Sequence, residues 1–253
     1  MNDLNRDLSV FAEGEPVTGF RHAYLSGRDA AGLLPLPFLL RIWNPDESAY
    51  LLLCAAKEIS VMSGDSVLAF GKVSAVYRRT VPEGTVCEII FSPGLKLWEA
   101  QVSLSVEAGV SVSDTVRRIL SASGTGIPLL AWSGEDPVRS RGQAFFGRAA
   151  ECVNEALSAT GARACLNRSG LCVLPAADAP VTLVLSEADL IDAPVVVNNL
   201  LVLRTRVVGW PLGKKASIKW KGQSWEGIVT ERAVEADNMD GQWQCELILE
   251  IRE

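Results

Sequence analysis

The last stretch of the chain constrains the fold more strongly than any other part of the sequence. From Gln242 to Arg252, apolar and polar residues alternate, and Ile248 is the only apolar residue at a polar position. The apolar set is Trp243, Cys245, Leu247, Leu249 and Ile251. Successive side chains of a β-strand point to opposite faces, so this period of two predicts a strand with one buried face and one solvated face.

The preceding residues predict the strands that pair with it. The expected strands are Leu200–Val208, Ala216–Trp220 and Ser224–Ala236. Gly209–Gly213 should turn the chain, because its proline fixes φ and its glycines accept positive φ. Asp237–Gly241 should close the last two strands into a hairpin.

The first hundred residues also indicate short strands separated by turns. The expected strands are Val17–Leu25, Pro37–Asn44, Ala49–Ala55, Glu58–Met62, Ser66–Phe70, Lys72–Thr80 and Thr85–Phe91. Gly71 is a candidate for a β-bulge. Residues 1–16 show no clear period and are interpreted as an arm or an edge segment. Turn signals recur about every eight to twelve residues, which favours a sandwich or barrel over βαβ units.

The middle of the chain has a different pattern. From Ser111 the apolar residues have helical spacing, and Ser111 with Asp114 resembles a capping box; Gly124 should end this helix. A second helix is expected over about Ala144–Thr160. Ala162–Leu166 and Leu171–Leu174 should then form a hairpin.

These patterns predict a mainly β (α+β) protein with three parts. The N-terminal β domain covers residues 1–98, an inserted α/β domain covers 99–182, and a C-terminal β portion covers 183–253. Pro175–Pro180 and the acidic stretch Glu187–Asp192 are interpreted as the link into the last part.

Composition limits the classes of partner. The formal net charge is −6, which argues against a general nucleic-acid binder with a basic face. The longest apolar runs, Leu33–Leu40 and Tyr50–Ala56, are much shorter than the ~20 residues of a membrane-spanning helix, so no membrane insertion is expected. Met1–Phe11 does not resemble a secretory signal, which suggests synthesis in a cytoplasm. The cysteines at positions 54, 87, 152, 165, 172 and 245 form no CxxC pair and are interpreted as small buried apolar side chains.

The sequence contains no catalytic, cofactor-binding or metal-binding constellation that we would assign. His22 is the only histidine, so it alone could serve as the base of a Ser–His or Cys–His pair. We interpret it as a structural or surface residue, and one histidine with dispersed cysteines does not give the ligand spacing of a zinc site.

Three further groups are considered and set aside. The carboxylates Asp46 and Glu47, and the set Glu187, Asp189 and Asp192, are interpreted as solvated turns, although a glycosidase would need two facing carboxylates. Gly124–Gly126 lacks the flanking strand and helix of a phosphate-binding loop. The basic cluster consists of Lys214, Lys215, Lys219 and Lys221, with Trp220 and Trp225 nearby. It is interpreted as the charged rim of a hairpin that protects an edge strand, and the alternative is a nucleic-acid face.

The order of these parts resembles the baseplate hub (tail hub) proteins of long-tailed bacteriophages, the late control D-like family. The resemblance rests on Phe70–Val73 before a strand, the helix Val112–Leu120, and Ala149–Gly161 followed by the turn Arg168–Leu171. It also rests on Gly241–Cys245 after the strand Gly227–Thr230.

This resemblance implies two tail-tube-like antiparallel β-barrels with a small α/β domain inserted between them. It further implies a homotrimer, a ring of six barrels that joins the sixfold tail tube to a threefold spike or central fibre. The expected partners are the tail tube protein, the spike or central fibre protein, the tape measure protein and other baseplate proteins. DNA would pass through the lumen without specific binding, and the protein would have no enzymatic activity, cofactor or metal.

Two alternatives remain open. The first is a cell-wall hydrolase or glycan-binding component at the tail tip that uses acidic residues such as Glu187 or Asp189. The second is a relative of bacterial secretion spikes, which would share the same barrels.

Overall fold

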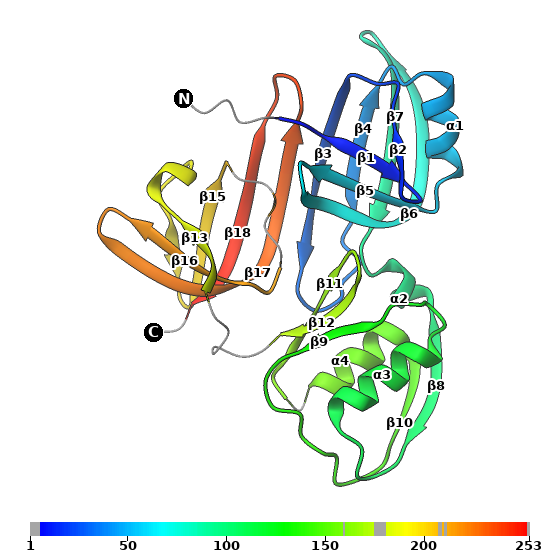
Figure 1. Cartoon of the computed structure of the whole chain (residues 1–253), viewed down its shortest axis with the longest axis vertical. Coiled ribbons are helices and arrows are strands. Elements are labelled where there is room, and N and C mark those ends of the chain that lie inside the picture. The colour runs from blue at the N-terminus through cyan, green and yellow to red at the C-terminus, as the bar shows by residue number, and fades with distance from the viewer. Residues whose placement is uncertain (1–5, 159, 175–180, 207–208, 210–211, 252–253) are drawn as a thin grey trace.

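A computed structural model describes residues 6–158, 160–174, 181–206, 209 and 212–251. Figure 1 shows two β units side by side, one formed by the N-terminal strands and one by the C-terminal strands, with an α/β unit at one end of the N-terminal unit. The strands are predominantly antiparallel, and the predicted mainly β fold class is confirmed.

The N-terminal β unit contains seven strands and one helix among the described residues. They are β1 (Ser9–Ala12), β2 (Glu15–Val17), β3 (His22–Ala30), β4 (Phe38–Trp43), α1 (Glu47–Ala55), β5 (Glu58–Ser63), β6 (Ser66–Val81) and β7 (Gly84–Ser92). The segment expected to be an arm or edge forms β1 and β2, and β2 is the last strand on its side of the sheet.

The C-terminal β unit is built around the alternating final strand. Its elements are β13 (Val181–Leu185), η1 (Glu187–Asp189), β14 (Val195–Val197), β15 (Leu200–Thr205), β16 (Lys215–Trp220), β17 (Gln223–Asp237) and β18 (Trp243–Ile251). In β18 the residues Trp243, Cys245, Leu247 and Leu249 are buried, and the intervening residues are partly exposed. The period of two therefore identified the buried face correctly. Residues 207–208 and 210–211, which fall in the predicted strand end and turn, lie outside the described residues.

A single strand pairing joins the two β units into one sheet. Strand β17 pairs on one side with β18 and on the other with β3, so the order runs from β14 through β17, β3 and β7 to β2. Buried residues from both units form one hydrophobic core, which includes Leu25, Phe38, Leu203 and Leu247. The two β units therefore share their interior.

The α/β unit has a second hydrophobic core, built from helices α3 and α4 and the strands around them. Its elements are α2 (Leu95–Glu99), β8 (Gln101–Val106), α3 (Val112–Ala122), β9 (Leu129–Trp132), β10 (Gln143–Arg148), α4 (Ala149–Leu157), β11 (Arg163–Asn167) and β12 (Gly170–Leu174). Ser111 accepts a hydrogen bond from the Asp114 amide at the start of α3, and Gly124 follows its end with φ 64°, as the sequence indicated. The predicted hairpin is confirmed as β11 and β12. The domain boundaries stay a prediction.

The expected strand Ala49–Ala55 is wrong, because this segment belongs to helix α1. Asp46 caps it by accepting a hydrogen bond from the Ala49 amide at 2.8 Å. The period of a short apolar run does not distinguish a strand from a half-buried helix. Here the Asp46 cap favours the helix.

The expected helix Ala144–Thr160 begins too early. Residues Gln143–Arg148 form strand β10, which pairs with β8, and α4 starts at Ala149. The expected strand Val17–Leu25 is likewise divided, because Gly19 has φ 84° between β2 and β3. At β10 a partner strand distant in sequence sets the boundary, and local spacing does not record that partner.

Replacing Leu247 with Asp should destabilise the protein by roughly 4–5 kcal/mol, because Leu247 is fully buried and the change places an unpaired carboxylate in the core. Urea denaturation followed by circular dichroism measures the loss. The control is Ile248→Asp, whose side chain points to the solvated face and which should lose far less. Equal losses in the two variants would contradict the predicted register.

Candidate functional site

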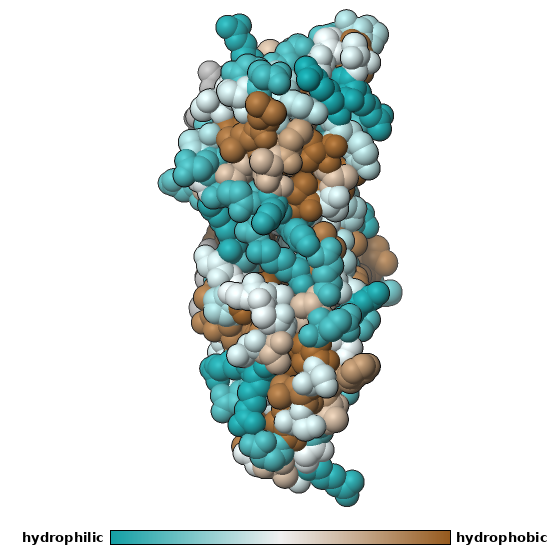
Figure 2. Space-filling view, turned by 90° about the vertical axis from the view of Figure 1, so that its right-hand side faces the viewer, coloured by the Kyte–Doolittle hydropathy of each residue, from teal (hydrophilic) through white to brown (hydrophobic). Residues whose placement is uncertain are grey.

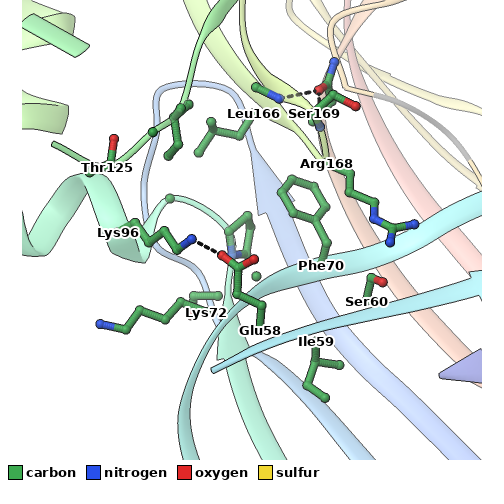
Figure 3. A pocket seen from close by; sticks show the side chains of 18 of the residues that line it. Glu58, Ile59, Ser60, Phe70, Lys72, Lys96, Thr125, Leu166, Arg168 and Ser169 are labelled. Atoms are coloured by element: carbon green, nitrogen blue, oxygen red, sulfur yellow. Dashed lines mark hydrogen bonds and ion pairs between the residues drawn. The ribbon is translucent and has the colours of Figure 1, made fainter. Parts of the chain in front are cut away.

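A cavity lies at the junction between the N-terminal β unit and the α/β unit. Its volume is about 230 Å³, and its walls come from β1, β5, β6, the start of α2, the loop 125–128 and the β11–β12 turn. Figure 3 shows Glu58, Phe70 and Lys96 on one side of this cavity, and Leu166, Arg168 and Ser169 on the hairpin opposite. We call this space the junction cavity.

Polar contacts fix the α/β unit at this junction. Lys96 of α2 forms an ion pair with Glu58 of β5, and Glu99 forms one with Lys72 of β6. The Gly32 amide donates to the Ala164 carbonyl at 2.9 Å, and the Asn154 side chain donates to the Gly32 carbonyl at 2.9 Å. The ion pairs are partly exposed and individually weak, but together with the backbone contacts they define one placement of the unit.

Glycines allow the backbones to approach one another at the same junction. A Cβ on Gly71 would lie 2.2 Å from the carbonyl carbon of Ser92, and one on Gly170 would lie 2.5 Å from the Pro128 carbonyl oxygen. Both positions therefore need glycine for steric reasons. The register shift in the β6–β7 pairing lies between Val73 and Ala75, so the extra residue is Ser74, three residues beyond the expected position at Gly71.

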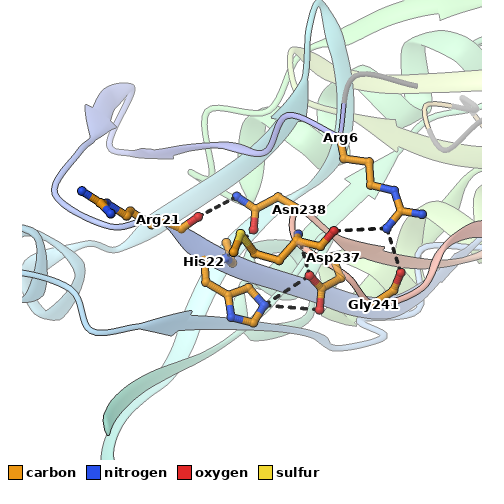
Figure 4. Close-up of polar contacts among 8 residues, drawn as sticks. Arg6, Arg21, His22, Asp237, Asn238 and Gly241 are labelled. Atoms are coloured by element: carbon orange, nitrogen blue, oxygen red, sulfur yellow. Dashed lines mark hydrogen bonds and ion pairs between the residues drawn. The ribbon is translucent and has the colours of Figure 1, made fainter. Parts of the chain in front are cut away.

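His22 belongs to a cluster that holds the tip of the β17–β18 hairpin. Its Nε2 lies 3.2 Å from Asp237 Oδ1, and its ring stacks on Trp43 at 4.0 Å between centroids. Asn238 accepts a hydrogen bond from the Ala23 amide, and Arg6 donates to the Gly241 carbonyl at 3.0 Å (Figure 4). His22 is partly buried and paired with a carboxylate, in keeping with the structural role expected from the sequence.

The side of the sheet opposite the core forms a continuous face across both β units, which we call the outer face. One row of paired positions runs across five strands and consists of Asp237, Tyr24, Arg41, Glu88 and Tyr77. Glu88 lies between two arginines, with Arg41 Nε and Arg79 Nε each 2.9 Å from its carboxylate. Around Glu88 the charges of the outer face are therefore paired.

The main strand order ends at β14 and β2, while a branch from β17 through β16 ends at β13, and the β14 and β2 ends are chemically different. Strand β14 consists of Val195, Val196 and Val197, which are 56%, 47% and 52% exposed. Strand β2 at the other end carries Pro16, which lacks an amide donor, beside the exposed Glu15. Charges and proline protect an edge strand from pairing with another chain, and an exposed apolar edge invites it. The β14 edge is therefore a candidate for contact with a second chain.

On another side of the molecule, the exposed apolar side chains do not form a continuous edge like that of β14. Figure 2 shows the side that carries α1, β6, β8 and β10, and hydrophobic residues form separate patches there between hydrophilic ones. Leu51 of α1 is exposed there, and single exposed leucines are common on protein surfaces.

The carboxylates considered as catalytic candidates have local structural partners. Asp46 caps α1, and hydrogen bonds from the Ala49 amide and Ser48 lower its pKa. Asp189 accepts from the amide and hydroxyl of Ser186, and Asp192 forms an ion pair with Arg204. Glu47 and Glu187 are exposed in the first turns of α1 and η1. These contacts stabilise turns and helix starts rather than a pair of carboxylates that face one another.

The basic cluster divides between several roles. Lys215 forms an ion pair with Glu226 at 2.9 Å across the β16–β17 pairing, and Lys221 lies over the Trp220 ring. Lys219 is exposed on β16, and Lys214 lines a separate cavity. The cluster was expected to protect an edge strand, and this is wrong for the start of β16, which pairs with both β13 and β17. Gly126 of the discarded glycine loop lines the junction cavity.

The cysteines are mostly buried. Cys87, Cys152, Cys165 and Cys245 are buried, Cys172 is partly exposed, and Cys54 is exposed, which corrects the expectation for that residue. Burial raises the pKa of the Cys87 thiol to about 11 and that of Cys245 to about 12, so these thiols remain protonated.

Two broader searches concern only the part of the chain that the structure describes. Within those residues no group of three or more His, Cys, Asp or Glu side chains is placed to hold a metal ion. Within the same residues no helix has the length and apolar character needed to cross a membrane.

Comparison with solved structures finds this fold in phage tail proteins. The tail protein from Neisseria meningitidis MC58 matches with a TM-score of 0.69 at 13% identity, over 96% of this chain and 95% of that chain. The 43 kDa tail protein of prophage MuSo2 from Shewanella oneidensis matches with a TM-score of 0.70 at 9% identity, over 96% of both chains.

A third match comes from a secretion machine. The E. coli c3393 protein, a component of the type VI secretion system with structural similarity to the T4 tail proteins gp27 and gp5, matches with a TM-score of 0.70 at 11% identity. The match covers 96% of this chain and 77% of that chain. No family model matches the sequence, and no curated protein is similar to it in sequence. At these identities the comparisons establish that the chain has the fold of phage tail proteins.

Replacing Gly71 with Ala should destabilise the protein by roughly 2–4 kcal/mol, because the added methyl meets the Ser92 backbone and the residue keeps a positive φ. The matched control is Gly222→Ala, which also has positive φ but has no atom within 4 Å of the added Cβ. It should lose about 1–2 kcal/mol. Urea midpoints measure both changes, and equal losses would show that close packing at Gly71 is unimportant.

Proposed function

We propose that this chain is a structural hub protein of a phage tail. Three copies form a ring with pseudo-sixfold symmetry, because each copy contributes two β units. The ring joins the hexameric tail tube to a trimeric spike or central fibre and encloses a channel for DNA. The observation that carries the proposal is the outer face, which runs without interruption across both β units while their other side is buried in one core.

The chemistry of the outer face suits the wall of a DNA channel. Its glutamates include Glu231, Glu235 and Glu246, and its arginines lie beside carboxylates, as Arg41 and Arg79 do beside Glu88. An arginine paired with a carboxylate offers little net attraction to phosphate, and an acidic excess repels it. A face of this kind lets DNA pass without holding it.

The β14 edge supplies a contact between neighbouring copies. Residues that flank a two-residue turn form a hydrogen-bonded pair, so in the β14–β15 hairpin the amide and carbonyl of Val196 point away from β15. These groups and the three exposed valines form an unpaired edge that a neighbour can extend. A closed ring satisfies such an edge in every copy.

The proposed setting is the virion, at the tail tip or baseplate, after synthesis in the host cytoplasm. The proposed partners are the tail tube protein, the spike or central fibre protein, the tape measure protein and other baseplate proteins. We assign no enzymatic step to the chain, because the fold is that of tail proteins and the candidate carboxylates Asp189 and Asp192 have structural partners.

The purified protein should form a trimer, and Val196→Lys should shift it toward monomer because a lysine on an edge strand opposes strand pairing. Light scattering coupled to size-exclusion chromatography measures the mass. The control is Leu51→Lys, which adds the same charge at an exposed leucine of α1 and should leave the trimer intact. A native protein that is a stable dimer would overturn the ring, and a trimeric Val196→Lys variant would exclude the β14 edge from the contact.

A further inference from the structure

A second cavity shares Phe70 and the β11–β12 turn with the junction cavity. Its volume is about 480 Å³, within the usual range for small-molecule pockets. All three units contribute to it: Phe70 comes from the N-terminal β unit, Ser133 and Cys172 from the α/β unit, and Lys214 and Arg232 from the C-terminal unit. We call this space the three-unit cavity.

The three-unit cavity is rich in positive charge. Arg168, Lys214 and Arg232 line it, and Asp29 is the acidic residue among its lining side chains. Asp29 faces Arg232 directly across the β3–β17 pairing at 3.5 Å, and both side chains are almost fully buried. The Asp29 carboxylate is therefore engaged by Arg232, which leaves two further cations in the same space.

Those two cations have no carboxylate partner among the residues that the structure describes. Arg168 contacts the Met62 sulfur at 3.7 Å and lies 6.0 Å from the centre of the Phe11 ring, and Figure 3 shows it beside Phe70 at the edge of the junction cavity. Burial raises the pKa of the Cys172 thiol, and the positive charge of nearby Lys214 partly opposes this rise. Both residues are exposed, and both line the three-unit cavity.

The remaining walls indicate the kind of molecule that would fit. Val67, Phe70 and Leu212 provide apolar surface, and Ser133 and Asn167 provide groups able to hydrogen-bond. A carboxylate or phosphate group gains charge-assisted hydrogen bonds from arginine and lysine, and these are stronger than neutral ones. An apolar body would pack on the apolar side chains.

We propose that the three-unit cavity binds a small organic anion through Arg168 and Lys214. Binding stabilises the protein, because the ligand contacts all three units only when they are in their folded arrangement. This site is independent of the proposed hub function, since it requires neither the outer face nor the β14 edge.

Citrate is the probe for the first measurement, with sodium chloride added to match ionic strength in the reference sample. Calorimetric titration should show saturable binding, and the melting temperature should rise with citrate concentration. Arg168→Gln and Lys214→Gln should each weaken binding at least about tenfold. Lys219→Gln removes the same charge from an exposed position on β16 and should bind citrate like the native protein.

Inorganic phosphate in the same assay separates an organic anion from a general anion site, and binding at least as tight as that of citrate would overturn the assignment to an organic anion. Absence of citrate binding in the millimolar range, or equal binding by all three variants and the native protein, would overturn the site itself.

Cysteine alkylation gives a second readout that does not depend on stability. Cys172 lines the three-unit cavity, and Cys54 is exposed elsewhere on α1. Citrate should slow the reaction of Cys172 with N-ethylmaleimide and leave that of Cys54 unchanged. A Cys172 rate that is insensitive to saturating citrate would contradict binding in this cavity.

Discussion

The pairing of β17 with β3 is the constraint on which the rest of the structure depends. It brings the first and last thirds of the chain into one sheet and one core. Near one end of this pairing, Asp29 and Arg232 are directly opposite each other and almost fully buried. Burial raises the pKa of Asp29, while the charge of Arg232 opposes that rise. A buried pair of this kind adds little stability compared with apolar residues in the same place. Losing either partner would leave an unpaired charge in the core, so the pair favours this register over its alternatives.

This pairing also determines what the outside of the molecule can do. Because the two β units belong to one sheet over one core, the outer face is continuous across both. Charged residues on neighbouring strands of this face can therefore pair, as Glu88 does with Arg41 and Arg79. Along the main strand order, the β2 end is protected by Pro16 and the β14 end is exposed. A protein that assembles by adding neighbours needs this asymmetry, since one adhesive edge and one protected edge allow directed contacts and limit uncontrolled aggregation.

The sequence predicted those parts of the fold that local chemistry decides. The alternation of β18, the cap at Ser111, the end of α3 at Gly124 and the β11–β12 hairpin all agree with the structure. Prediction failed where the pattern allows two structures. The apolar run in α1 fits a strand as well as a helix. The residues Gln143–Arg148 continue the helical spacing of the segment that follows, but pairing with β8 makes them a strand. The junction cavity, the three-unit cavity and the pairing of His22 with Asp237 join residues distant in sequence, so no local signal could have revealed them.

By itself, then, the sequence determined which residues face the core, where several elements begin and end, and that the chain is mainly β, because side-chain periodicity and capping act over a few residues. Only the tertiary structure decided that the two β units form one sheet, that the outer face is continuous, that the outer edge of β14 has no strand partner among the described residues and that Arg168 and Lys214 share a cavity. These properties depend on which distant strands pair and on how closely the three units pack. Pairing and packing of this kind involve residues far apart in sequence, so no local pattern specifies them.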